Sequence, residues 1–264
     1  MDSYRPLLKW AGGKRWLLPT IERIWRSHPG RRYVEPFSGG ASIAFGLKPE
    51  SAVLNDINPH LINFYRHVRR GLSLDIDLRY DEDLFYSHRE RFNSIINNNG
   101  GSRSSEAAQL FYYLNRTGFN GLCRFNGSGL FNVPFGKYKD IEYQREFGPY
   151  RELFRRWELR SVDFEKLQLE RGDFVYCDPP YFSGGRPTFD KYTPQGFSWE
   201  DQVRLTEWLA RHRGPVLLSN QASSKITQLY RRLGFSLRFL SGPRRINANG
   251  IRVDVREVLA SRNL

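Results

Sequence analysis

The amino-acid sequence predicts an α/β fold in which one sheet with crossover helices is interrupted by a mostly helical insertion. Strand and helix signals alternate along the first part of the chain, and this βαβ pattern is typical of parallel strands. The pattern stops in the middle third and returns after residue 160. We therefore expect a sheet domain formed by 1–57 and 160–264, with an inserted domain at 58–159.

The first third of the chain holds two predicted strands and two predicted helices. Strands are expected over 32–37 and 52–57. A glycine-rich turn follows the first of them and leads into a helix that begins near Ala41. Another helix is expected from about Pro59 to Gly71. The two parallel strands end at one edge of the sheet, which is where open α/β folds bind their ligands.

The middle third has a different character. Amphipathic patterns predict helices over 81–98 and 104–116. Residues 117–138 contain five glycines and several aromatic side chains, a composition that suits a hairpin or a structured loop. After residue 160 strands and helices alternate again; the expected ranges are 174–177, 215–219, 235–241 and 253–260 for strands, and 198–212 and 223–233 for helices.

Composition excludes several classes of protein. Hydrophobic residues make up 39% and charged residues 26% of the 264 residues, so disorder, collagen and coiled coil are excluded. The 33 Arg and 8 Lys outnumber 28 acidic residues, for a net charge of +13. Arginine-biased codon usage or a polyanionic partner would each explain this excess, since arginine pairs with phosphate and with guanine. The charge is spread along the chain, which favours contact through a folded surface.

The cellular setting is inferred from apolar runs and cysteines. No apolar run approaches the roughly 18 residues that span a bilayer, and the N-terminus lacks the apolar core of a signal peptide. Cys123 and Cys177 form no CxxC motif. We expect a cytoplasmic protein with no membrane partner, no disulfide framework and no structural zinc.

The turn after the first strand is a candidate ligand site. Residues 35–42 place Gly39 and Gly40 between a strand and a helix, where a ligand can approach the backbone. Asp56 ends the next strand, where an acid commonly accepts the hydroxyls of a ribose. The turn is neither GxGxxG nor GxxxxGK[ST], which argues against a dinucleotide dehydrogenase and a P-loop NTPase. We favour an adenosine-containing ligand over a merely tight connection.

A second candidate site follows the strand at 174–177. Asp178–Pro179–Pro180–Tyr181 cannot continue a central strand, because proline donates no backbone hydrogen bond. The Asp is an acceptor and Tyr181 a flat stacking face, and together they suit an exocyclic amine on a planar base. The alternative is a strand that simply ends in a proline turn. Residues 8–14 (LKWAGGK) either stack on a charged ligand or form a surface turn, with equal weight.

These segments, in this order, resemble the Dam family of DNA adenine-N6 methyltransferases. The resemblance rests on several stretches spread along most of the chain: 7–14, 33–42, 111–126, 131–139, 175–181, 217–220 and 244–250. It implies a Rossmann-like seven-stranded methyltransferase sheet with a reversed final strand. It also implies an inserted target-recognition region that contains a DNA-reading hairpin, with double-stranded DNA as partner and S-adenosyl-L-methionine as cofactor.

The resemblance also implies roles for individual residues. The cofactor-binding set is Trp10, Lys14, Phe37, Gly39, Asp56, Asp163, Phe164 and Asp178, with Asp56 on the ribose. In the hairpin, Arg124 is expected to read a guanine, and its companions at the bases are Phe119, Asn120, Leu122 and Pro134. Lys9 is expected at the outer base pair, and the expected phosphate contacts are Arg116, Lys137 and Lys139. A palindromic GATC target and a monomeric enzyme complete the expectation.

Two positions depart from the family pattern. Ala41 stands where glycine is usual in the cofactor turn, which would loosen cofactor binding without excluding it. Phe119 stands where tyrosine is familiar in the hairpin, so a flat face is kept and a hydroxyl is lost. The second departure concerns the detail of target recognition and not the class of enzyme.

The mechanism expected from the resemblance places the chemistry at Asp178–Pro179–Pro180–Tyr181, which we call the proline corner. The target adenine must leave the duplex, after which Tyr181 stacks on it and Asp178 and the Pro179 carbonyl accept hydrogen bonds from its N6 amine. Positioning then supplies most of the rate, with no metal. Methylation of RNA or of a protein glutamine, and a non-catalytic DNA-binding protein, remain the competing hypotheses.

Overall fold

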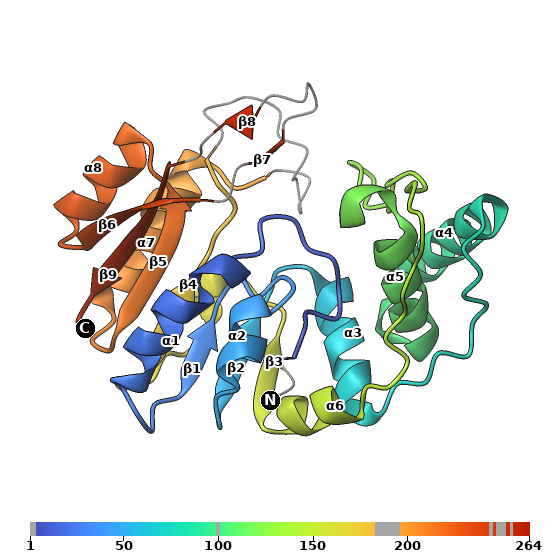
Figure 1. Cartoon of the computed structure of the whole chain (residues 1–264), viewed down its shortest axis with the longest axis horizontal. Helices are drawn as coiled ribbons and strands as arrows, with labels where there is room; N and C mark the ends of the chain where they lie inside the picture. The colour runs from blue at the N-terminus through green and yellow to red at the C-terminus, as the bar shows by residue number, and fades with distance from the viewer. Residues whose placement is uncertain (1–3, 99–100, 183–195, 243–244, 247–251, 254–255) are drawn as a thin grey trace.

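The computed structural model describes residues 4–98, 101–182, 196–242, 245–246, 252–253 and 256–264. Seven strands of this part form one sheet in the order β3-β2-β1-β4-β5-β9-β6 (Figure 1). Their bounds are β1 (Tyr33–Glu35), β2 (Ala52–Asn55), β3 (Trp157–Arg160), β4 (Phe174–Cys177), β5 (Val216–Gln221), β6 (Ser236–Ser241) and β9 (Arg256–Arg262). β1 to β5 pair in parallel, whereas β9 is antiparallel to both β5 and β6. The Rossmann-like sheet with its reversed final strand is therefore confirmed.

Helices cover both faces of the sheet and extend beyond its β3 edge (Figure 1). The helices of the described residues are α1 (Leu18–Arg26), α2 (Ser42–Leu47), α3 (Pro59–Arg70), α4 (Glu82–Asn97), α5 (Ser105–Thr117), α6 (Gly148–Arg155), α7 (Trp199–Arg211) and α8 (Ser224–Arg232). Short 3-10 turns occupy Arg15–Leu17, Gly101–Arg103, Phe119–Gly121 and Phe164–Lys166, and β7 (Arg245–Ile246) pairs with β8 (Arg252–Val253). None of the helices in these ranges is long and apolar enough to cross a bilayer.

The hydrophobic core has two layers that alternate along the strands. In β4, Phe174 and Tyr176 belong to the layer under α1 and α3, whereas Val175 and Cys177 belong to the layer under α7 and α8. A parallel strand covered on both faces is expected to be apolar throughout, as this one is. The first layer continues without a break into α4 and α5 through residues such as Phe92. The inserted helices therefore share a core with the sheet.

Most predicted elements occur within a few residues of their expected bounds, from the glycine turn to the helix at 199–211. The residue patterns did not predict α1, α6, β3 or β7, although the family resemblance implies a third sheet strand before Asp163, which is β3. β3 has the sequence Trp-Glu-Leu-Arg, and its two charged residues make it hard to recognise as a strand from the sequence. It is an edge strand and starts inside the range expected for the insert. The segment 117–138 does fold back on itself, but without a regular strand ladder in the described residues. Its arms are joined by the isolated bridges Gly118–Phe135 and Phe125–Phe131 and by hydrogen bonds of the loop backbone. The start of the strand expected at 253–260 lies partly outside the described residues.

Candidate active site

The carboxyl ends of β1, β2 and β4 bring three predicted residues to one edge of the sheet. Gly39 lies in the turn after β1, Asp56 directly follows β2, and Asp178 directly follows β4. We refer to Gly39, Asp56, Asp178 and Tyr181 as the strand-end site. These strands are parallel neighbours, so the loops that follow them share an edge of the sheet.

Gly39 is required because the indole of Trp10 lies against it. A Cβ at Gly39 would come within 2.6 Å of Trp10 Nε1, and the backbone φ of +44° is one that favours glycine. Gly40 is also close, since a Cβ there would lie 3.1 Å from Trp10 Cβ. The predicted residues Trp10 and Gly39 are therefore in contact. The Tyr65 hydroxyl of α3 donates to the Gly39 carbonyl at 2.7 Å, and this hydrogen bond helps to fix the turn.

Asp56 is a buried carboxylate held by two backbone amides. Its Oδ2 accepts from Gly39 N–H and its Oδ1 from Asn58 N–H, both at 2.9 Å. Burial raises the pKa of Asp56 to about 6, and the two amide hydrogen bonds partly oppose that rise. Each oxygen keeps a further lone pair, so the carboxylate retains the capacity to accept hydroxyl groups.

Asp178 is positioned by a hydroxyl on one side and an ammonium on the other. Ser219 of β5 donates its hydroxyl to Asp178 Oδ1 at 2.7 Å, and Lys14 Nζ lies 3.3 Å from Oδ2. Because Ser219 uses its proton on Asp178, the Tyr176 hydroxyl, 3.2 Å from Ser219 Oγ, is the donor in that contact. The Lys14 side chain is 3% exposed, and that of Asp178 is 20% exposed. The carboxylate is thus oriented but still reaches the surface.

Tyr181, the last residue of the proline corner, is held by contacts with three other parts of the chain. Its hydroxyl donates to Glu257 Oε2 at 2.9 Å, and Lys14 Nζ lies 4.7 Å from the centre of its ring. The turn that carries it is fixed by Gln202, whose side-chain amide donates to the Pro180 carbonyl at 2.8 Å. Pro179 is buried beside these residues. The tetrapeptide is therefore tied to β9, to α7 and to the N-terminal segment.

An aromatic group lies next to the strand-end site. Phe37 packs on Phe164 and on Phe197, with ring centres 5.7 and 5.5 Å apart. The Asp163 carboxylate is already engaged, because it accepts from Glu165 N–H at 3.0 Å and pairs with Arg204 at 3.1 Å. Phe37 is half-buried and can offer a flat apolar face, whereas Phe164 is buried with the Arg204 guanidinium 4.7 Å from its ring centre. Asp163 caps the short helix that starts at Phe164.

The hairpin side chains expected at DNA bases are more exposed. Phe119 is 46% exposed and Pro134 is also exposed, whereas Leu122 is half-buried. Asn120 adopts a left-handed backbone with φ of +52°. Among the described residues, the Arg124 side chain donates to Asn132, to its side-chain oxygen at 2.8 Å and to its carbonyl at 3.2 Å.

The basic residues expected at DNA divide into anchored and exposed ones. Lys9 Nζ donates to the Arg116 carbonyl at 2.8 Å and lies 3.4 Å from the centre of the Tyr138 ring. Burial, with a smaller effect of the Arg116 charge, lowers the pKa of Lys9 to about 8. Arg116 donates to the Glu142 carbonyl at 2.6 Å. Lys137 and Lys139 are exposed.

Comparison with known proteins identifies the family. The profile of the D12 class N6 adenine-specific DNA methyltransferases matches residues 10–240. The chain belongs to this family. Three similar proteins are also named as methyltransferases or DNA adenine methylases. The type II methyltransferase M1.LlaDCHI of Lactococcus lactis subsp. cremoris is 37% identical over 87% of this chain and 85% of its own length. The DNA adenine methylase of Vibrio cholerae is 34% identical over 98% of this chain and 96% of its own length. The retron Ec67 DNA adenine methylase of Escherichia coli is 32% identical over 92% of this chain and 86% of its own length.

The protein is therefore a DNA adenine methyltransferase, and its family implies S-adenosylmethionine as methyl donor. The strand-end site and its turn fit such a group on two observations. Asp56 retains lone pairs for hydroxyls, and the hydroxyl of Ser38 is buried without a hydrogen-bond partner among the described residues. The turn thus presents polar groups that a bound ligand can satisfy.

Several residues of this methyltransferase were missed by sequence reasoning. Ser219 and Glu257 hold Asp178 and Tyr181. Asn115 of α5 joins the N-terminal segment to the hairpin. Its side chain bonds Lys9 N–H and the Lys9 carbonyl at 2.8 Å each, and its amide also donates to the Gly121 carbonyl at 3.4 Å. Asn58 bonds both Asp56 and the Cys123 thiol of the hairpin. A polar residue inside an apolar run, as in Leu-Leu-Ser-Asn, is the signal that could have found Ser219.

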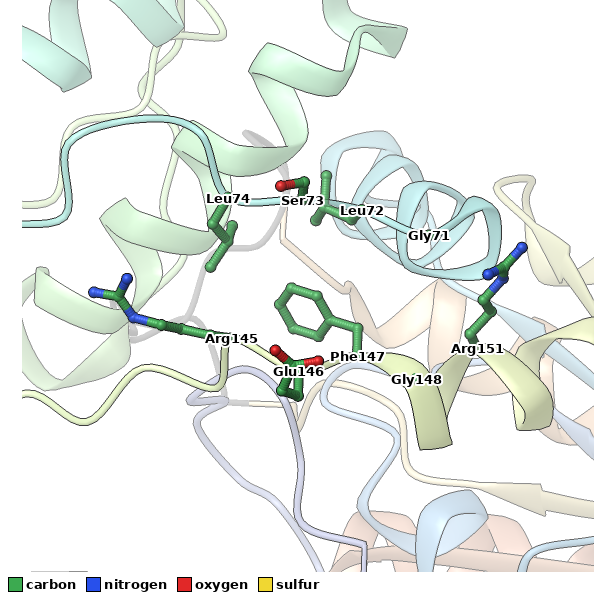
Figure 2. Close-up of a pocket in the computed structure, with 9 residues that line it drawn as sticks. All are labelled: Gly71, Leu72, Ser73, Leu74, Arg145, Glu146, Phe147, Gly148 and Arg151. Carbon is green, nitrogen blue, oxygen red and sulfur yellow. The ribbon is translucent and has the colours of Figure 1, made fainter.

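A separate hollow of about 380 Å³ lies at the other end of α3 (Figure 2). Gly71, Leu72 and Arg151 are among the residues that line it. α3 begins three residues after Asp56 and has 12 residues, so its far end is about 18 Å from the strand-end site. This hollow is thus not part of the active site.

Proposed function

We propose that this enzyme transfers the methyl group of S-adenosylmethionine to the N6 amine of an adenine that has been flipped out of duplex DNA, within the sequence GATC. The observation that carries the proposal is the position of Asp178 and Tyr181, an oriented acceptor and a flat ring, at the sheet edge that also holds Gly39 and Asp56. A base and a methyl donor bound at this edge would be neighbours.

Each residue of the strand-end site has a proposed role. Asp56 accepts the ribose hydroxyls, and Trp10, Lys14, Phe37, Gly39, Asp163 and Phe164 border the cofactor. Tyr181 stacks on the adenine, while Asp178 and the Pro179 carbonyl accept hydrogen bonds from its amine. The bound cofactor supplies an electrophilic methyl group. Two acceptors in line with the amine protons favour a tetrahedral nitrogen, and preorganised groups of this kind stabilise the charge that develops on transfer.

The fixed surroundings of Asp178 support this role. Its two oxygens are held by Ser219 and Lys14 before any substrate binds, so little reorganisation is needed during the reaction. Lys14 also lies over Tyr181, which places one positive charge beside both residues of the corner. We infer that Lys14 supports both pockets, the cofactor pocket and the base pocket.

DNA reading is assigned to the insert at 58–159. Arg124 would read a guanine through its fork, and Phe119, Asn120, Leu122, Pro134 and Lys9 would contact the neighbouring bases. Arg116, Lys137 and Lys139 would bind phosphates, which adds affinity without sequence information. One strand is methylated at a time, so a monomer suffices. A DNA substrate is consistent with a cytoplasmic enzyme.

The proposal is tested by methyl transfer from tritiated S-adenosylmethionine to duplexes that differ by one base pair around GATC. We expect label in N6-methyladenine of the GATC duplex and a large loss for each single change. Label at another base or atom would reject the proposed N6 chemistry. Equal label in all duplexes would reject the proposed target.

A further inference from the structure

The ring of Tyr181 is anchored by a carboxylate from the last strand of the sheet. The phenol donates to Glu257 Oε2 at 2.9 Å, although 76 positions separate the two residues. Glu257 is 3% exposed. It lies in register with Gln221 of β5 on one side and Leu240 of β6 on the other. Two backbone ladders therefore fix the place of this carboxyl group.

The sheet itself does not require an acid at this position. Burying a carboxylate costs several kcal/mol unless hydrogen bonds or an opposite charge compensate. The next residues of β9, Val258, Leu259 and Ala260, are apolar and at most 3% exposed, and they fill the core in the usual way. A buried acid among such residues indicates a role in polar contacts, and its described hydrogen bond is the one with Tyr181.

The hydrogen bond constrains the plane of the ring. A phenol O–H lies in the plane of its ring by conjugation, so an acceptor with a fixed position defines that plane. The backbone end of Tyr181 is fixed independently, because Gln202 binds the preceding carbonyl of Pro180. Lys14 lies over the ring, 4.7 Å from its centre. The ring is thus held at both ends before any base arrives.

We propose that Glu257 is a positioning residue for methyl transfer, which holds the Tyr181 ring in the plane on which the target adenine stacks. This inference rests on the proposed function, because it takes Tyr181 as the stacking residue. Its effect is preorganisation: a ring already in place directs the amine toward the methyl donor, whereas a ring that rotates presents the base in unproductive orientations as well.

The kinetic test is a double-mutant cycle on single-turnover transfer to a GATC duplex. We expect Glu257→Ala to lower the transfer rate about 10- to 100-fold, with nearly unchanged binding of cofactor and duplex. Glu257→Gln keeps an acceptor oxygen and should retain most of the rate. In a Tyr181→Phe background, Glu257→Ala should change the rate less than about twofold, because the bond is already absent. A full additional loss in that background would overturn the proposal.

A matched control is Asp173→Asn, which alters another buried carboxylate of the sheet domain. Asp173 is 1% exposed, pairs with Arg32 at 2.8 Å and precedes β4, at the opposite end of that strand from Asp178. This variant should lose stability while its folded fraction keeps the wild-type rate. If Glu257→Ala behaves in the same way, Glu257 has only a structural role and the proposal is wrong.

A spectroscopic measurement separates this proposal from the proposed function. The ¹³Cζ resonance of Tyr181, assigned by its loss in Tyr181→Phe, reports on the hydrogen bond of the phenol and needs no substrate. It should shift in Glu257→Gln and Glu257→Ala but not in Asp173→Asn. An unmoved resonance would overturn the positioning role even if transfer occurs. A shifted resonance in a protein that labels no adenine would reject the proposed function and leave the Glu257–Tyr181 contact established.

Discussion

The strand-end site and the hairpin of residues 117–139 are held in place by different kinds of bonds. Asp56 and Asp178 directly follow strands whose ladders set their positions, and Gly39 lies in the turn after β1. The hairpin is joined by isolated bridges and by hydrogen bonds of loop backbone and side chains, and the Arg124 side chain is held by Asn132 among the described contacts. The proposed site of chemistry is therefore built on strand ends, whereas the proposed reading surface depends on local loop contacts.

The difference predicts separable functions. A change at the strand-end site should affect transfer or cofactor affinity without altering which sequence is read. A change in the hairpin should alter sequence choice without altering cofactor affinity. The two regions are nevertheless joined, because Asn58 bonds both Asp56 and Cys123, and Asn115 ties Lys9 to α5. Variants at each region measure how far this separation holds.

The largest effect is expected at Asp178. Asp178→Ala removes the proposed acceptor for the target amine, and we expect transfer to fall about 100- to 1,000-fold or more. Cofactor affinity should decline less, and the protein should remain folded. Ser219→Ala removes only the hydroxyl that holds Asp178 and should lower the rate by a smaller factor. Single-turnover kinetics with both variants measure this order, and unchanged turnover in Asp178→Ala would remove Asp178 from its role.

The next effect is expected in the hairpin. Arg124→Ala should cost about 1–3 kcal/mol of discrimination at the guanine position, or roughly 5- to 150-fold in relative rate. Binding of S-adenosylmethionine should stay within error of the wild type. Competition between GATC and duplexes changed at that guanine measures the first quantity, and calorimetry the second. A collapse of cofactor affinity would show that the two regions are not separable.

A smaller effect is expected from pH at Asp56. Burial raises the pKa of this group from 3.8 to about 6, so the cofactor-free protein holds a proton there below that pH. Ribose hydroxyls bind best to the ionised form, and cofactor affinity should therefore fall as pH decreases below about 6, by up to about tenfold per pH unit. In the cofactor-free protein the raised pKa contributes stability that is present below 3.8 and lost as pH rises through 6.

The control for this prediction is Asp56→Asn, which binds more weakly but should lose the pH dependence. Glu35 is a second fully buried carboxyl nearby, and burial also raises its pKa well above the usual value. A pH dependence that persists in Asp56→Asn would therefore point to Glu35. Titrations of cofactor binding between pH 5 and 8, in both proteins, decide between the two groups.

The smallest effect is expected at Ala41. This residue has a left-handed backbone with φ of +51°, which costs an L-residue roughly 1–2 kcal/mol. Its methyl group is fully buried and is worth about 0.8 kcal/mol. Ala41→Gly removes both contributions, so the free energy of unfolding should change by less than about 1.5 kcal/mol. Denaturant titration measures this, and a large destabilisation would mean that the methyl group supports the turn.

Much of the strand-end site could be predicted from the sequence because strand ends and glycine turns are local features. The contact of Trp10 with Gly39 and the pairing of Lys14 with Asp178 needed the fold to bring distant segments together. Glu257 was missed for a topological reason: β9 is inserted between β5 and β6, and no local pattern reveals which strand becomes its neighbour. Asp163 shows the reverse case, since the family resemblance implies a place near the cofactor but cannot reveal the pairing of Asp163 with Arg204.

The central claim is that the corner formed by Asp178 and Tyr181 receives an extruded adenine beside the methyl donor. It is tested most directly by the structure of a complex with a GATC duplex and a cofactor analogue that cannot transfer its methyl group. We expect the adenine outside the helix, stacked on Tyr181, with its N6 atom in hydrogen-bond contact with Asp178 and the Pro179 carbonyl. An adenine that remains paired in the duplex, or one that is bound away from this corner, would contradict the account.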